Sequence, residues 1–262
     1  MIPKVIHYCW FGGSELPEYV ERCIQSWKKY CPDYQIIRWD ESNYDYRKFP
    51  FCEEAYKEKK WAFVSDVARL DIVYSYGGIY LDTDVELIKG LDELLIEHAF
   101  MGFERGRLVA TGLGFGGEKG NPIIKKNLDA YLNRSFLNEN GSMNLTPCPV
   151  ITTDVLMTFG LKKIDQTQDL IDMKVFSSDC FCPMLLSDGT AEVGDNTYSI
   201  HHYAGSWTTV TEKEKVKKRT EIYTKYGRLG LKVYDGSSVL KDEGILAFVR
   251  RLLEAFKRKL RI

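Results

Sequence analysis

The amino-acid sequence predicts an α/β fold in which helices flank a mostly parallel sheet. Residues 5–39 contain a strand, a helix and a second strand in succession, and this order is typical of the start of a parallel sheet. A second helix–strand unit follows at residues 61–81 and ends in two aspartates. The chain of 262 residues is long enough for one large α/β domain with small additions.

The first three elements are expected at residues 5–10, 17–30 and 34–39. β-Branched and aromatic residues fill the first and third segments, VIHYCW and YQIIRW, which favours strands. The middle segment starts at a proline and carries apolar residues at helical spacing, which predicts a helix. The three segments together predict one βαβ unit.

The clearest helix is expected at residues 61–76, where apolar residues form a stripe at helical spacing. Two glycines at 77–78 end this helix, and residues 79–81 form a short apolar strand. Asp82 and Asp84 follow the strand directly. Because ligands of open α/β sheets bind outside the carboxyl ends of the strands, a functional site is expected here.

Beyond residue 98 the pattern is less regular. Residues 99–117 predict strands around glycine-rich turns, and the Asn-Pro pair that opens residues 121–132 predicts a helix there. Residues 150–159 predict a further helix. Residues 133–149 are polar and predict a loop, and residues 173–205 are mixed.

Composition excludes several classes of protein. Apolar residues make up 44% of the chain and charged residues 28%, a globular balance that argues against disorder. The formal net charge of -1 gives no overall field that would attract nucleic acid. No apolar run approaches the roughly 20 residues needed to span a bilayer. The N-terminus carries no secretory signal pattern.

The seven cysteines are expected to be reduced thiols in a cytoplasmic protein, because their number is odd and no secretory segment precedes them. Cys180 and Cys182 have one residue between them, fewer than the roughly two to four that are usual in zinc sites. We therefore favour buried thiols over a metal site for this pair.

Asp82 and Asp84 are separated by one residue, so on a strand both side chains would point to the same face. Carboxylate oxygens suit hard divalent cations such as Mg²⁺ and Mn²⁺. Two acids are too few for a closed site, and they suit a metal whose other positions are taken by water and substrate phosphate. An isolated Asp-X-Asp is common on protein surfaces, so the neighbouring residues decide its meaning.

Three polar residues, Ser65, Asp66 and Arg69, lie on the helix before this strand. Asp66 and Arg69 are three positions apart and share one face of the helix. One interpretation is a surface ion pair that contributes roughly 0.3 kcal/mol. The other is that Asp66 accepts hydrogen bonds from sugar hydroxyls while Arg69 neutralises phosphate or sugar oxygens.

The segment WAFVSDVARLDIVYSYGGIYLDTDVEL, residues 61–87, resembles the family 32 glycosyltransferases, which carry an Asp-X-Asp motif. That group includes yeast-type mannosyltransferases, bacterial capsule enzymes and, more distantly, clostridial toxin glucosyltransferase domains. The opening IPKVIHYCWFGG is similar to the family's first strand, which contacts the nucleobase. The resemblance covers roughly residues 1–120 and returns near residue 200. It implies a GT-A fold, a mostly parallel nucleotide-binding sheet flanked by helices.

The resemblance also implies a role for each polar residue of this segment. Asp84 would be the most direct metal ligand. Asp82 would bind the ribose or reach the metal, in part through water. Asp66 and Arg69 would hold the transferred sugar, and Ser65 would assist them.

The aromatic residues at the end of the first strand are implied to border the donor's uracil or guanine. Either Tyr8 or Trp10 would offer the base a stacking face, and packing in the core is the alternative for both. His7 lies between apolar residues of the same strand. A buried, hydrogen-bonded histidine is therefore expected there rather than a catalytic one.

The late segment YSIHHYAGSW, residues 198–207, carries the second part of the resemblance. It implies that His201 completes the metal sphere, with His202 as the second candidate, since imidazole is a reasonable ligand for Mn²⁺. Ser206 and Trp207 would donate a hydroxyl and an indole N–H to phosphate oxygens. Core packing is the alternative for Trp207.

The resemblance thus implies a retaining glycosyltransferase that moves a sugar from a nucleotide diphosphate donor to a saccharide or lipid-linked acceptor. Mn²⁺ or Mg²⁺ would be the cofactor, UDP-sugar the donor, with GDP-mannose as the alternative, and bacterial surface polysaccharide synthesis the setting. No carboxylate in the sequence stands out as a nucleophile, which favours a front-face route in which the departing phosphate takes the acceptor proton. The glycines of residues 111–122 would let the backbone approach a ligand, or they form a hairpin turn.

Residues 1–235 are expected to form the glycosyltransferase domain and residues 236–262 a basic amphipathic C-terminal helix. Within the segment GILAFVRRLLEAFKRKLRI, residues 244–262, apolar residues form one stripe and basic residues lie mostly opposite. Such a helix suits an anionic membrane surface, and would place the enzyme at the inner face of the cell membrane near a lipid-linked acceptor. Packing on the domain or on a second subunit is the alternative.

Two other functions fit parts of the sequence. A strand that ends in Asp-X-Asp also occurs in metal-dependent phosphatases, where the first acid is the phosphoryl nucleophile, but the later lysine and further acidic pair of that motif have no convincing place here. The third possibility is a sugar-nucleotide-binding protein without catalysis. Phosphate release from a phosphomonoester would identify the phosphatase, and donor turnover would exclude the binding protein.

Overall fold

The computed structural model describes residues 1–105, 107–185 and 191–204, together with residues 214, 217–222, 224–226, 230 and 233–234. The chain divides into two compact units, Met1–Lys213 and Glu214–Ile262. The described residues of the second unit are helical. Residues 236–262 lie outside the described residues, so the basic helix and its membrane contact stay predictions, as does the expected domain boundary.

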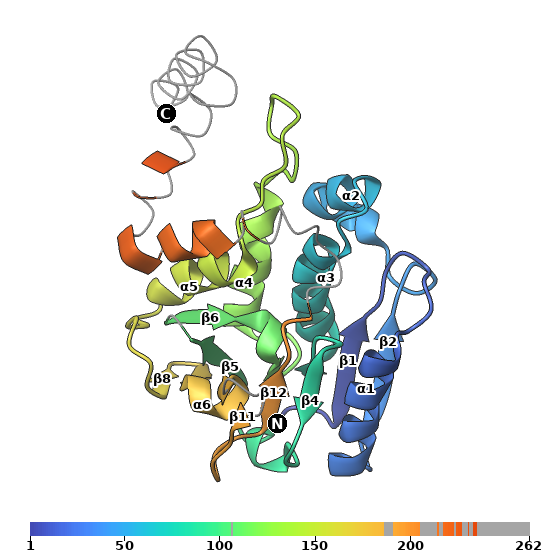
Figure 1. The fold of residues 1–262 in the computed structure, drawn as a ribbon, viewed down its shortest axis with the longest axis vertical. Coiled ribbons are helices and arrows are strands. Elements are labelled where there is room, and N and C mark those ends of the chain that lie inside the picture. The colour runs from blue at the N-terminus through green and yellow to red at the C-terminus, as the bar shows by residue number, and fades with distance from the viewer. Residues whose placement is uncertain are drawn as a thin grey trace. The chain divides into compact units, whose positions relative to one another are not determined.

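The first unit is built on an eight-stranded sheet (Figure 1). Its strand order is β2 (Gln35–Trp39), β1 (Val5–Cys9), β3 (Gly78–Tyr80), β7 (Phe115–Gly117), β5 (Ala99–Glu104), β9 (Met173–Phe176) and β8 (Gln168–Leu170), and β6 (Leu108–Ala110) pairs with β5. Because β7 is antiparallel to both β3 and β5, the strands β1, β2, β3, β5 and β9 all run in one direction. The predicted α/β class with a mostly parallel sheet is confirmed.

Two hydrophobic cores lie on opposite faces of this sheet. Strand β1 shows the division, because Ile6, Tyr8 and Trp10 belong to one core while Cys9 and Phe11 belong to the other. A strand that is covered on both faces is apolar almost throughout, which explains the opening run of the sequence.

Helices cover each of the two cores. Those on the face that holds Cys9 are α2 (Pro50–Lys57), α3 (Trp61–Tyr76), α4 (Pro122–Leu132) and α5 (Cys148–Met157). The other face is covered by α1 (Glu18–Tyr30) and α6 (Ser178–Phe181). Short 3₁₀ helices occur at η1 (Tyr46–Lys48), η2 (Asp92–Leu94) and η3 (Thr111–Leu113).

Local signals set the boundaries of the expected helices. Helix α3 ends at Gly77, whose φ of 71° suits a glycine and whose N–H donates to the carbonyl of Val73. Helix α4 begins after Asn121, whose side-chain oxygen accepts from the N–H groups of Ile123 and Ile124 at 3.0 and 3.1 Å. The helices expected at 61–76 and 121–132 are confirmed for these reasons.

A short two-stranded ladder brings the late part of the first unit next to the motif. Strand β4 (Val85–Leu87) pairs in antiparallel fashion with β12 (Ser199–His201), as Figure 1 shows. The indole of Trp27 in α1 donates to the carbonyl of Val85 at 2.8 Å and fixes the ladder to the core. A second ladder joins β10 (Met184–Leu185) and β11 (Ala191–Glu192).

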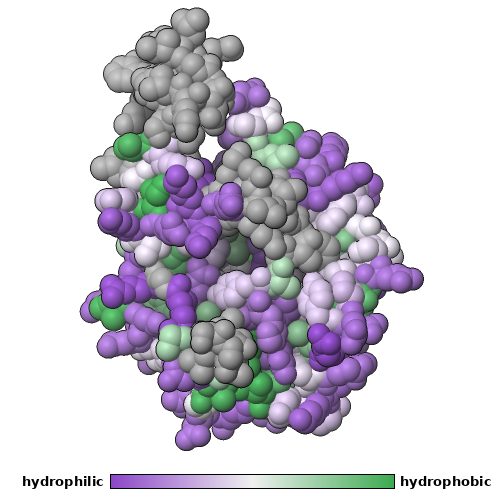
Figure 2. Space-filling model, in the orientation of Figure 1, coloured by the Kyte–Doolittle hydropathy of each residue, from purple (hydrophilic) through white to green (hydrophobic). Residues whose placement is uncertain are grey.

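Hydrophilic residues cover most of the face shown in Figure 2, and hydrophobic residues gather near its lower edge. In the part of the chain that the structure describes, no helix is both long enough and apolar enough to cross a membrane.

Candidate active site

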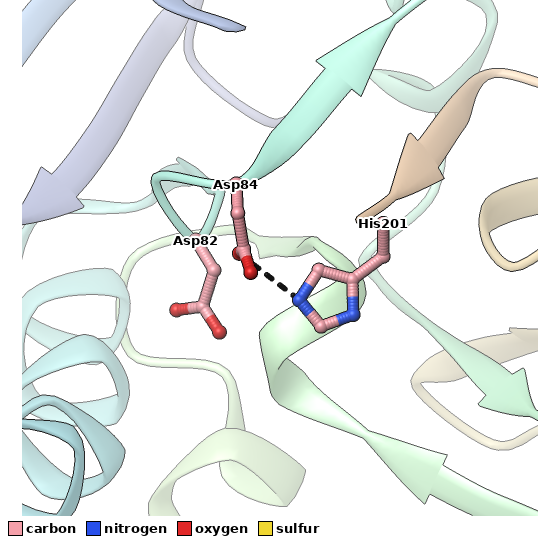
Figure 3. A group of neighbouring side chains, drawn as sticks. All are labelled: Asp82, Asp84 and His201. Carbon is pink, nitrogen blue, oxygen red and sulfur yellow. Dashed lines mark hydrogen bonds and ion pairs between the residues drawn. The ribbon is translucent and has the colours of Figure 1, made fainter. Parts of the chain in front are cut away.

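Asp82, Asp84 and His201 form a cluster beyond the end of β3. One ligand atom of each residue lies within 4.8 Å of the other two. The carboxylates come from the turn between β3 and β4, the imidazole comes from the end of β12, and the three side chains point toward one another (Figure 3). The structure thus brings together the three residues predicted as metal ligands.

Backbone pairing explains how residues so distant in sequence meet. In the ladder of β4 and β12, His201 lies opposite Val85 and therefore next to Asp84. The N–H of His202 then donates to the carbonyl of Asp84 at 3.0 Å, and the N–H of Ala204 donates to Oδ2 of the same residue at 2.8 Å. Residues 201–204 therefore wrap around Asp84.

Arg69 and Tyr80 hold Asp82. The Arg69 guanidinium lies 3.2 Å from both carboxylate oxygens of Asp82, and the Tyr80 hydroxyl donates to Oδ1 at 3.0 Å. The guanidinium also lies over the Tyr80 ring, 5.4 Å from its centroid. Burial raises the pKa of Asp82, and the charge of Arg69 acts against this rise.

Asp66 and Arg69 form a buried ion pair. Their exposed fractions are only 8% and 3%, and the Arg69 guanidinium donates to the Asp66 carboxylate. Nε of Arg69 also donates to the carbonyl of Ser65 at 3.1 Å. The interpretation of this pair as a surface feature is wrong, because α3 is buried on most of its circumference. Arg69 instead links Asp66 to Asp82.

The electrostatic setting of Asp84 differs from that of Asp82. Nε2 of His201 lies 3.0 Å from Oδ1 of Asp84. Burial acts to raise the pKa of Asp84, but the hydrogen bond and charge of His201 lower this pKa overall, with help from the N–H of Ala204. Burial acts to lower the pKa of His201, but its contact with Asp84 raises this pKa overall. A cation at this position would compete with the His201–Asp84 hydrogen bond.

The backbone at Gly112 lies directly against this arrangement. A Cβ atom at Gly112 would be 2.5 Å from Oδ2 of Asp82 and 3.2 Å from Nη1 of Arg69. The absence of a side chain at Gly112 therefore allows the backbone to pass close to these two protein side chains, while the expected approach of the glycines in residues 111–122 to a ligand stays a prediction.

A pocket opens beside the cluster. Its lining combines the predicted residues Ser65, Arg69, Asp82, Asp84 and His201 with Cys9, Tyr19, Ala62, Tyr80, Thr83 and Tyr203. Sequence reasoning missed the last six. Tyr80 and Thr83 could have been found as direct neighbours of the motif, and Tyr203 as a neighbour of the histidine pair. Tyr19 and Cys9 carry no local signal.

The two aromatic residues predicted to border the nucleobase lie in the core. Tyr8 is 7% exposed and packs edge-on against Trp27, 5.6 Å between ring centroids. Trp10 is 2% exposed and donates its indole N–H to the carbonyl of Ser14 at 2.8 Å. Neither is among the described residues that line the pocket, so their contact with a base stays a prediction.

The other predicted residues have different outcomes. His7 is buried, accepts a hydrogen bond from Trp39 and contacts the carbonyl of Gly77 at 2.9 Å, so the expected structural role is confirmed. His202 is turned toward Glu86, at 2.9 Å, and lies outside the cluster. Ser206 and Trp207 lie outside the described residues. All seven cysteines are unpaired, and Cys180 and Cys182 are buried.

The chemistry of the cluster fits a divalent cation. Two carboxylate oxygens and one imidazole nitrogen suit Mn²⁺, and the carboxylates alone also suit Mg²⁺. Nε2 of His201 is the ring atom that faces the carboxylates. Nδ1 of the same ring is buried and has no hydrogen-bond partner among the described residues. Three protein ligands leave positions for water and phosphate oxygens.

Comparison with known families identifies the same region. Residues 17–101 match the family model described as a glycosyltransferase sugar-binding region containing a DXD motif. The match includes Asp66, Arg69, Asp82 and Asp84 and ends before His201. The resemblance to the DXD glycosyltransferases is confirmed for this region.

Curated relatives support the same assignment. Inositol phosphoceramide mannosyltransferase 3 of Schizosaccharomyces pombe is 34% identical over 122 residues, which is 40% of this chain and 34% of the relative. An uncharacterized glycosyltransferase of Acanthamoeba polyphaga mimivirus is 30% identical over 159 residues, 56% of this chain and 60% of that protein. The chain thus matches about a third of the fission yeast protein and three fifths of the viral one.

Two solved structures are similar in part. The PaToxG glycosyltransferase aligns with a TM-score of 0.47 at 25% identity, over 60% of this chain and 68% of that chain. A glycosyltransferase involved in the glycosylation of the major capsid of PBCV-1 aligns with a TM-score of 0.46 at 10% identity, over 82% and 100% of the two chains.

Proposed function

We propose that this protein is a metal-dependent glycosyltransferase that transfers a sugar from a nucleotide diphosphate donor with retention of anomeric configuration. The observation that carries the proposal is the convergence of Asp82, Asp84 and His201 within 4.8 Å beside a pocket. The match of residues 17–101 to a DXD sugar-binding region supports it. The mostly parallel sheet with helices on both faces is the architecture expected of a GT-A fold.

Each part of the cluster has a task in this reaction. A divalent cation held by Asp84 and His201, with Asp82 as a further ligand or as a partner of the ribose, would neutralise the charge that develops on the leaving diphosphate. Arg69 stays charged because it is paired with Asp66 and Asp82, and its guanidinium adds positive potential to the pocket wall. Ser65 lines the same wall and offers a hydroxyl to the sugar.

The carboxylates of the pocket favour a front-face route. Retention by double displacement requires a carboxylate nucleophile beneath the sugar. Among the described residues that line the pocket, only Asp82 and Asp84 are acids, and both are already engaged. In the front-face route the departing phosphate oxygen takes the proton of the acceptor hydroxyl. A trapped covalent glycosyl-enzyme adduct, or an inverted product anomer in NMR spectra, would contradict this route.

The donor that we propose is a UDP-sugar, with GDP-mannose as the second candidate because several relatives are named mannosyltransferases. The proposed acceptor is a saccharide or lipid-linked saccharide of a bacterial surface polysaccharide. Inositol phosphoceramide in the names of the yeast relatives supports a lipid-linked acceptor. The basic segment 244–262 would hold the enzyme at the cytoplasmic face of the membrane.

A phosphatase is a weaker candidate. Its nucleophile would be Asp82, but both oxygens of this residue face the Arg69 guanidinium and one also accepts from Tyr80. A carboxylate whose two oxygens are both engaged in this way has little freedom to attack a phosphorus atom, so it is a poor nucleophile.

A panel of nucleotide sugars with Mn²⁺ tests the proposal. A donor at 100 times its dissociation constant should stabilise the protein by about 2.7 kcal/mol, which a thermal-shift assay detects. We expect the same donor to be turned over, with release of nucleoside diphosphate, and Asp84→Asn to lower the rate at least about a hundredfold.

Asp195→Asn is the matched control, because it makes the same change of charge at an exposed acid. Phosphate release from p-nitrophenyl phosphate without donor turnover would instead support the phosphatase. Donor binding without turnover for every acceptor class would support a binding protein.

A further inference from the structure

Tyr203 has an unusual backbone conformation beside the cluster. Its φ of 50° lies in the left-handed region, which costs a non-glycine residue about 1 kcal/mol. Among the described residues two others share this feature without being glycine: Lys59 follows the end of α2, and Arg107 lies in the turn between β5 and β6. Tyr203 alone of the three lines the pocket. Strain of this kind is expected where the surrounding structure requires it.

The left-handed conformation of Tyr203 directs the following backbone N–H to the motif. After the pairing of β12 with β4 ends at His201, the N–H of Ala204 donates to Oδ2 of Asp84 at 2.8 Å. His201 contacts the other oxygen of the same carboxylate at 3.0 Å. The left-handed residue between them allows both oxygens of Asp84 to be held by one short segment.

The side chain of Tyr203 packs against the imidazole. The ring centroids of Tyr203 and His201 are 4.1 Å apart with an angle of 55° between the planes. The Tyr203 hydroxyl lies 3.1 Å from Sγ of Cys182, a buried residue at the end of α6. The ring therefore contacts Cys182 through its hydroxyl and packs against His201.

The imidazole depends on this support. Nδ1 of His201 has no hydrogen-bond partner among the described residues, although metal-binding histidines usually have their second nitrogen held in this way. The orientation of the ring is therefore set by Asp84 at Nε2 and by packing against Tyr203. Once a cation takes the place of Asp84 at Nε2, packing against Tyr203 is the restraint that the described residues still place on the orientation of the ring.

We propose that Tyr203 is a positioning residue that orients His201 and Asp84 for a divalent cation without touching the cation itself. Its ring takes the place of a hydrogen bond to Nδ1, for which the described residues provide no partner, and its left-handed backbone aims the Ala204 N–H at Asp84. This inference rests on the proposed metal-dependent function.

Binding of Mn²⁺ to the full chain, measured by electron paramagnetic resonance, tests the role of Tyr203. Titration gives the dissociation constant, and electron spin echo modulation detects the ¹⁴N nucleus of a bound imidazole. In the wild-type protein we expect one imidazole coupling, which His201→Ala removes. Tyr203→Asn keeps a residue that tolerates the left-handed conformation but removes the ring. It should weaken Mn²⁺ binding about tenfold and reduce the ¹⁴N modulation.

Two further variants keep the test decisive. Tyr203→Phe retains the ring and should keep the imidazole coupling, with Mn²⁺ binding within about threefold of wild type, because a hydroxyl–thiol contact is weak. Tyr226→Asn makes the same change at an exposed tyrosine and should alter neither measurement. If Tyr203→Asn fails to fold, Tyr203→Leu supplies the same comparison, because it also removes the aromatic ring.

The outcomes distinguish failure of the proposed metal site from failure of the positioning role of Tyr203. If the wild-type protein does not bind Mn²⁺, or binds it without the ¹⁴N coupling, the proposed metal site is wrong and so is the role of Tyr203. Wild-type binding and coupling that persist unchanged when the ring of Tyr203 is removed would overturn the positioning role alone, and the proposed function would stand.

Discussion

The two aspartates of the motif are held by different parts of the chain. Asp82 is held by Arg69 and Tyr80, which are 13 and two positions away in sequence. Asp84 is held by His201 and Ala204, which are 117 and 120 positions away. The first set belongs to one helix–strand unit, and the second exists only because β12 pairs with β4.

The Asp-X-Asp spacing identifies the two acids in the sequence. Their different surroundings in the structure give them different pKa values. Burial raises the pKa of Asp82, while the contact with His201 lowers the pKa of Asp84 despite burial. The Asp82 side is a buried ion-pair network that joins the core. Asp84 can exchange its contact with the His201 imidazole for a contact with a cation. The predictions that follow test this contrast, from the largest expected effect to the smallest.

Arg69→Ala should have the largest effect on stability. It leaves the buried carboxylate of Asp66 and the partly buried carboxylate of Asp82 without their cation, which costs about 3 kcal/mol in the free energy of unfolding. Urea denaturation measures the loss. His201→Ala is the matched change on the Asp84 side, and it should cost only about 1 kcal/mol while it abolishes the imidazole contribution to Mn²⁺ binding. Equal losses in the two variants would contradict the contrast.

Gly112→Ala should disturb the Asp82 side without any change of charge. The added methyl group would lie 2.5 Å from Oδ2 of Asp82, so the carboxylate must move away from Arg69, at a cost of about 2 kcal/mol in stability. The donor KM should rise in the same variant. Gly194→Ala is the control, because its Cβ would meet nothing within 4 Å. A wild-type melting curve for Gly112→Ala would show that the contact is not tight.

Glu104→Gln should change how stability depends on pH. Burial raises the pKa of Glu104 from 4.5 to about 7, although the charge of His201 acts against this rise. Between these pH values the unfolded chain ionises while the folded protein keeps its proton, so the wild type loses stability as the pH increases from 4.5 to about 7. The variant should lack this loss, so its free energy of unfolding should rise relative to that of the wild type between pH 5 and pH 8. Parallel pH profiles for the two proteins would refute the expectation.

Tyr80→Phe should have the smallest effect. It removes one hydrogen bond to Asp82 and keeps the ring beneath Arg69, so about 1 kcal/mol of stability is lost. Mn²⁺ affinity should change less than in His201→Ala, because Asp84 and its partners are untouched. An equal loss of Mn²⁺ affinity in both variants would mean that the two aspartates act as one unit.

Much of the fold could be predicted because its signals are local. Asn121 caps α4 and Gly77 ends α3, and both residues do so through hydrogen bonds and dihedral angles that the residue type favours. The ladder of β4 and β12 could not be predicted in this way. Its strands have three residues each, too few for a periodic pattern, and their pairing depends on contacts across the whole unit.

In the candidate site, too, some features could be predicted from local sequence and others could not. Arg69 could be singled out because it is close to the motif in sequence, but its burial could not, since a spacing of three residues fits a surface pair equally well. For Tyr8 and Trp10 the sequence could not decide between two roles. Their aromatic character fits a stacking role and a core role alike, and α1 and its neighbours cover them.

By itself the sequence determined the α/β class, the ends of α3 and α4 and the pair of aspartates after a short strand, because each depends on residues that are neighbours in the chain. Only the tertiary structure decided that His201 reaches Asp84, that Gly112 abuts Asp82 and that the ring of Tyr203 lies against the imidazole. The physical reason is that these contacts join segments whose approach is set by burial of the two cores and by strand pairing, and neither leaves a pattern in a short stretch of sequence.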